Sequence, residues 1–93
     1  MPHAVKIGRN VRIGENCSIG RCKVGDNVTI ARGSVIEDGA TIHDGARLAA
    51  HCVVGSGATI GSHARLGEGC VVEAGARVDR HSRAAAGAII KRG

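Results

Sequence analysis

The sequence contains no phenylalanine, tyrosine or tryptophan and only one proline among its 93 residues. Aliphatic side chains, alanine and cysteine still bring the hydrophobic share to 43%, which is too high for intrinsic disorder. The absence of rings counts against binding of single-stranded nucleic acid, which uses aromatic side chains as stacking platforms. The composition therefore predicts a thin, regular core in one small domain that spans residues 1–93.

Long apolar runs are also absent, since no 18 consecutive residues are apolar, and the opening Met1–His3 does not resemble a signal or transit peptide. We therefore expect a cytoplasmic protein that does not enter membranes. Thirteen Lys and Arg against eight Asp and Glu give a net charge of +5. This mild basic excess favours anionic partners, although nucleic acid is not expected among them.

An aliphatic residue recurs every six positions along most of the chain. A helix cannot produce this period, because six residues at about 100° each advance roughly 240° and would scatter the aliphatics around the cylinder. The chain must instead turn every six residues. The repeating aliphatic positions are Ile7, Ile13, Ile19, Val24, Ile30, Ile36, Ile42, Leu48, Val54, Ile60, Leu66, Val72, Val78 and Ile90, with Ala84 in the same register. The five-residue step from Ile19 to Val24 is the one break in the spacing.

Two further positions of each hexad have a fixed character. The residue four after each aliphatic is small and shares its inward face, because it lies two residues before the next aliphatic. The residue three after is Gly, Asn or His, the types that best tolerate positive φ, so it is the expected corner. Three hexads then form an 18-residue coil, and equivalent strands stack in parallel at about 4.8 Å. We expect one corner to be shortened at the break, with Cys17, Ser34, Cys52 and Cys70 remaining in one inward column.

The hexads "IGENCS", "VGDNVT", "VGSGAT" and "IGSHAR" resemble those of the hexapeptide-repeat superfamily. The resemblance covers about Val5 to Ile90 and implies an all-β fold, a left-handed parallel β-helix of about five triangular coils. Within the superfamily, "IGENCSIGRCKVGDNVTI" looks like the β-helical tails of sugar-phosphate nucleotidyltransferases. The superfamily is typically trimeric, and many of its members are acyltransferases.

Two outward columns follow from numbering the chain by coils. One face carries an apolar ladder at Val35, Val53, Val71 and Ile89, which predicts a self-association surface, most simply of a homotrimer. A second face carries Arg12, Thr29, Arg47, Arg65 and Arg83, and we expect these arginines to meet carboxylates of a neighbouring subunit. We also expect the last coil to contact another assembly or a partner end to end, because its strand edge is uncovered.

The four cysteines are predicted to be buried free thiols, because Cys17, Cys52 and Cys70 fall in the small inward column and Cys22 joins it across the break. No CxxC pair suggests zinc. His43 lies in a slot similar to that of a zinc-ligating histidine in γ-class carbonic anhydrases, which share the fold. The two further ligands of those enzymes are missing, so no metal site is expected.

The remaining candidate chemistry lies at histidines, because hexapeptide acyltransferases generally use one as a general base. His63 and His81 are one coil apart and are the candidate catalytic residues, with Arg65, Arg80 and Arg83 as candidate binding residues for an anion or for the phosphates of coenzyme A. The alternative is that His51, His63 and His81 only form corners.

Two functional classes therefore remain open. The first is a β-helical self-assembly module without catalysis or cofactor of its own. The second is a minimal acyl-CoA-dependent acyltransferase with a histidine base at a subunit interface.

Overall fold

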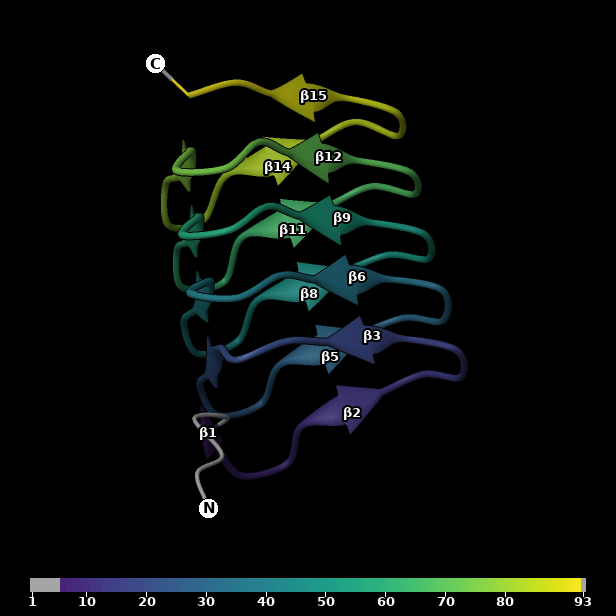
Figure 1. Ribbon diagram of the computed structural model, residues 1–93, viewed down its shortest axis with the longest axis vertical. Coiled ribbons are helices and arrows are strands. Elements are labelled where there is room, and N and C mark those ends of the chain that lie inside the picture. Colours follow the sequence, from purple (N-terminus) through teal and green to yellow (C-terminus); the bar gives the residue numbers. More distant parts are fainter. Residues whose placement is uncertain (1–5, 93) are drawn as a thin grey trace.

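The chain forms a triangular prism of three parallel five-stranded sheets in a computed structural model that describes residues 6–92 (Figure 1). Its extents are 36 × 23 × 23 Å, and five coils stack along the long axis in a left-handed sense (Figure 1). The all-β prediction is confirmed, since every regular element in this part of the chain is a strand. Val5, where the predicted repeat began, lies outside the described residues.

Each coil contributes one two-residue strand to each sheet. Sheet A contains β1 (Lys6–Ile7), β4 (Lys23–Val24), β7 (Thr41–Ile42), β10 (Thr59–Ile60) and β13 (Arg77–Val78). Sheet B contains β2 (Arg12–Ile13), β5 (Thr29–Ile30), β8 (Arg47–Leu48), β11 (Arg65–Leu66) and β14 (Arg83–Ala84). Sheet C contains β3 (Ser18–Ile19), β6 (Val35–Ile36), β9 (Val53–Val54), β12 (Val71–Val72) and β15 (Ile89–Ile90). Coil 1 is thus β1–β3, and coil 5 is β13–β15.

The corners lie where the sequence predicts them. Positive φ angles occur at Asn10, Asn16, Asn27, His51, His63 and His81, between 58° and 62°, and at seven glycines from Gly33 to Gly87. Only the predicted corner at Gly93 falls outside the described residues. Backbone bonds between coils continue through these corners, so that the His63 N–H donates to the Asp44 carbonyl at 2.9 Å.

The break in the repeat shortens one corner without interrupting the stack. Lys6 pairs with Lys23, seventeen positions later, whereas Lys23 pairs with Thr41, eighteen positions later. Residues 20–22 turn without a residue of positive φ, which accounts for the missing position. The predicted inward column is confirmed across the break. The Cys17, Ser34, Cys52 and Cys70 side chains each donate to a backbone carbonyl of the next coil, at 3.0–3.3 Å.

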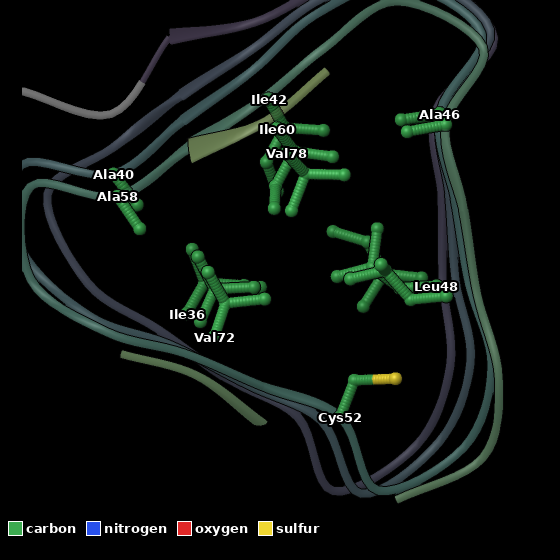
Figure 2. Packing of buried hydrophobic residues seen from close by; sticks show 14 of the residues in the cluster. Ile36, Ala40, Ile42, Ala46, Leu48, Cys52, Ala58, Ile60, Val72 and Val78 are labelled. Carbon is green, nitrogen blue, oxygen red and sulfur yellow. The ribbon is translucent and has the colours of Figure 1, made fainter. Parts of the chain in front are cut away.

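The core consists of aliphatic stacks that project inward from the three sides (Figure 2). Small residues such as Ala46, Ala58 and Cys52 lie close to the corners, where the chain leaves less room (Figure 2). Burial is complete in coils 2 to 4. The hexad aliphatics face inward and were expected to be buried throughout, but this is wrong at the two end coils. Ile7 and Ile13 are 48% and 37% exposed, and Ile19, Ala84 and Ile90 are only partly buried, because only one coil packs against each end coil among the described residues.

Candidate functional site

The edge between sheets A and B carries the two candidate catalytic histidines. Its corner column is Asn10, Asn27, Gly45, His63 and His81, all with positive φ. His63 and His81 therefore do form corners, but the corner depends on their backbone conformation and not on their imidazole rings. Both histidines remain exposed, so their imidazoles are available to a ligand.

The two imidazoles stack on each other across adjacent coils. Their ring centroids are 5.2 Å apart, with an angle of 11° between the planes. The His63 ring leans over the preceding corner, where a Cβ added to Gly45 would collide with its Nδ1 and Cε1 atoms. The missing side chain at Gly45 thus sets the direction of the stack.

Three arginines line the same edge from sheet B. Arg47, Arg65 and Arg83 lie on β8, β11 and β14 in direct register, and all three are exposed. We call them the arginine ladder. Strand spacing places successive members about 4.8 Å apart at the backbone, so their guanidinium groups crowd positive charge on one strip.

The stacked pair His63 and His81, which we call the histidine stack, lines one hollow together with the arginine ladder. The volume of this hollow is about 510 Å³. Its lining is Asn27, Gly45, Arg47, His63, Arg65, His81 and Arg83, and none of these residues is acidic. The structure thus brings together His63, His81, Arg65 and Arg83 of the predicted site. Arg47 was not among the predicted site residues, although the spacing of 18 already placed it in the same outward column.

The predicted binding residue Arg80 lies elsewhere. It lines a separate hollow of about 370 Å³ on the sheet A side, with His43, Ser62, Arg77 and Asp79 among its neighbours. Arg80 immediately precedes the corner residue His81, yet the two side chains line different hollows.

Two aspartates on the edge between sheets A and B are already occupied by backbone groups. Asp26 Oδ1 accepts from the Arg9 N–H at 2.8 Å, and Asp44 Oδ1 accepts from the Asp26 N–H at 2.8 Å. Both carboxylates thereby connect successive coils. Neither residue lines the hollow of the arginine ladder.

Among residues 6–92, no group of three or more His, Cys, Asp or Glu is arranged to hold a metal ion. His43 is exposed, and His51 lies at the edge between sheets B and C, with its ring against Gly33.

The thiols serve packing. Cys22, Cys52 and Cys70 are buried, Cys17 is partly buried, and all four are free. Burial raises the pKa of Cys22, with a smaller contribution from the charge of Asp38. Burial likewise raises the pKa of Cys52. Raised pKa values oppose formation of the reactive thiolate.

The predicted apolar ladder is continuous along sheet C, where Val35, Val53, Val71 and Ile89 pair in register. Its exposure is uneven. The three valines are half-buried, whereas Ile89 is 59% exposed. Beside it, the Glu37 carboxylate accepts from the Ser56 N–H and hydroxyl at 3.2 and 3.3 Å.

The part of the chain that the structure describes contains no helix long and apolar enough to span a membrane.

The fold is similar to that of solved structures described as acetyltransferases. One is a mutant of GDP-perosamine N-acetyl transferase from Caulobacter crescentus in complex with CoA and GDP-perosamine, at 23% identity and a TM-score of 0.81, covering 96% of this chain and 46% of that chain. Another is the acetyltransferase domain of PglB from Neisseria gonorrhoeae FA1090, at 21% identity and a TM-score of 0.58. This match covers 95% of the present chain and 46% of the PglB domain chain. The chain thus spans about half the length of these structures.

Sequence comparison agrees with the fold. The family described as bacterial transferase hexapeptide (six repeats) matches residues 4–38, 21–56 and 39–80. These matches together extend over most of the chain, and the chain therefore belongs to the bacterial transferase hexapeptide family.

Proposed function

We propose that this chain is the β-helical part of a CoA-dependent acyltransferase that acts at the edge between sheets A and B. The observation that carries the proposal is the stacked pair His63 and His81 in one hollow with three arginines. An exposed imidazole can act as general base, and neighbouring guanidinium groups can hold the anionic part of a substrate.

The chemistry required of the chain is modest. One imidazole of the pair takes a proton from the acceptor amine or hydroxyl as that atom attacks the thioester carbonyl. The carbon–sulfur bond of the tetrahedral intermediate then breaks, the imidazolium gives its proton to the leaving sulfur, and CoA departs as the thiol. The arginine ladder holds the phosphates of a substrate and so fixes the position of the reacting atoms.

The nature of the similar structures supports this choice over a purely structural role. The Caulobacter enzyme was solved with CoA and GDP-perosamine, a nucleotide-linked amino sugar. Acetyl-CoA as donor and nucleotide-linked amino sugars as acceptors are therefore the first compounds to test with this chain.

The test uses asparagine at the histidine corners, because Asn10, Asn16 and Asn27 already occupy equivalent corners with positive φ. Release of free CoA thiol is measured with acetyl-CoA and a panel of amino-sugar nucleotides. We expect His63→Asn or His81→Asn to lower the rate by a factor of roughly 10² or more. His51→Asn, at a corner outside the hollow, is the matched control and is expected to keep the wild-type rate. Equal rates in all three variants would contradict a catalytic role.

A second candidate function is self-assembly, which the continuous apolar ladder of sheet C favours. We propose that Val35, Val53, Val71 and Ile89 form an interface between copies, with a homotrimer as the favoured state. This role is compatible with acyl transfer at the edge between sheets A and B.

A further inference from the structure

We infer that the hollow on the edge between sheets A and B is a site for a linear oligophosphate, with successive phosphates lying along the axis of the β-helix. The inference deepens the proposed function, because it names the part of a substrate that this hollow recognises. It rests on the arginine ladder and on the shape of the hollow.

The arginine ladder works against folding in the absence of a ligand. Arg47 and Arg83 each lie directly opposite Arg65 on a neighbouring parallel strand, and like charges directly opposite one another are destabilising. No lining residue is acidic. Asp26 and Asp44, on the same edge, accept hydrogen bonds from backbone N–H groups of other coils. An external anion is therefore the missing counter-charge.

The hollow is elongated along the axis, because its lining comes from four successive coils. Asn27 belongs to coil 2, Arg47 to coil 3, Arg65 to coil 4 and Arg83 to coil 5. From the first arginine to the third, the backbone advances two strand spacings, or about 10 Å. A chain of phosphates can offer each arginine its own phosphate, whereas a single orthophosphate would require three like-charged side chains to converge on it.

The histidine stack forms the second wall. His63 and His81 follow the same axis, one coil apart, with nearly parallel rings. They place ring nitrogens beside the ladder, and these can donate to phosphate oxygens. Guanidinium groups bind phosphate in a bidentate manner, which accounts for arginine rather than lysine in this column.

The same chemistry has two possible sources in acyl transfer, the phosphates of CoA and the diphosphate of a nucleotide-linked acceptor. Inorganic orthophosphate, pyrophosphate and tripolyphosphate are the primary probes, titrated by calorimetry at constant ionic strength. Displacement of bound tripolyphosphate by CoA or by a nucleoside diphosphate then identifies the source.

We expect affinity to rise with each added phosphate, by at least tenfold from orthophosphate to tripolyphosphate. Arg65→Gln is expected to lower the affinity for tripolyphosphate at least tenfold, and Arg65→Lys to lower it by less. Arg12→Gln is the matched control, because Arg12 lies in the same outward column but pairs with Thr29 and does not line the hollow. It should change the affinity less than twofold.

Ligand-free stability provides a second measurement. Because Arg65→Gln relieves repulsion within the ladder, the variant should melt at or above the wild-type temperature. A clearly lower melting temperature would identify Arg65 as a structural residue and overturn the inference.

Three other results would also overturn it. The first is equal binding of the three phosphates, and the second is equal weakening of binding by Arg12→Gln and Arg65→Gln; either would indicate a general basic surface. The third is no phosphate binding together with loss of oligomers in Arg65→Gln, which would place carboxylates of a second copy on the ladder. Binding of tripolyphosphate with unchanged transfer in the histidine variants would retain this inference and reject the proposed function. The opposite pair of results would retain the function and reject the inference.

Discussion

At the scale of single residues, the corners decide what the edge between sheets A and B can hold. Gly45 and Gly57 both have positive φ, 74° and 70°, but their surroundings differ. A Cβ at Gly57 would meet no atom within 4 Å, whereas a Cβ at Gly45 would collide with the His63 ring. Gly45 therefore has two functions, one in the backbone and one in the histidine stack.

This pair predicts different effects for the same substitution. Gly57→Ala should lower the free energy of unfolding by about 1–2 kcal/mol, the usual cost of a left-handed conformation for a residue with a Cβ. Gly45→Ala should carry this cost and also displace His63, which separates the two rings. Denaturant unfolding measures the stability, and the crystal structure or the histidine NMR resonances report the stack. An unchanged stack in Gly45→Ala would show that the ring does not depend on this glycine.

At the scale of the strand, each two-residue element presents one side chain inward and one outward, so a sheet of five strands has one outward column. The three columns differ in character. Sheet C is apolar, sheet B carries the arginine ladder, and sheet A is polar, with Thr41 and Thr59 in coils 3 and 4. Only the column on sheet C gains by removal from water.

Replacing Val53 and Val71 with lysine should therefore convert the proposed oligomer to monomers, because two desolvated charges would oppose the contact. Sedimentation velocity measures the change. Thr41→Lys with Thr59→Lys is the matched control, since it places the same charges on the same two coils of sheet A and should leave the oligomer intact. A wild-type monomer would refute the proposed interface, and an oligomer that survives the valine substitutions would place the interface elsewhere.

At the scale of the whole molecule, stability depends on the number of coils that pack against each residue. Nearly all tertiary contacts join a coil to the next one, as the parallel pairing shows, which is the behaviour of a linear repeat protein. Ile60 has a coil on both sides and is fully buried, whereas Ile13 in coil 1 is 37% exposed.

The same truncation at these two positions should differ in cost. Ile60→Ala should lower the free energy of unfolding by about 2–5 kcal/mol, the range for a large buried aliphatic that leaves a cavity. Ile13→Ala should lower it by less than half as much, since part of its side chain is already in water. Denaturant unfolding followed by circular dichroism compares the two variants. Equal losses would indicate that coil 1 is as tightly packed as coil 4.

The sequence by itself determined the repeating architecture. The period, the inward columns and the corners were predictable because each is a local property repeated in every hexad. The short corner between Ile19 and Val24 was predictable as the one departure from that period. The half-exposure of Ile7 and Ile13 could not be read from that period, which assigns every hexad the same environment.

Only the tertiary structure decided which side chains share the hollow. Arg80 directly precedes His81 in the sequence, yet its side chain lines another hollow. Arg47, which lies in a preceding coil, lines the same hollow as His63 and His81. The stack of His63 on His81 over Gly45 depends on ring orientation and on the space left by a missing Cβ. A one-dimensional repeat specifies which residues are neighbours along the axis, but side-chain rotation and the angle between sheets determine which of them meet around it.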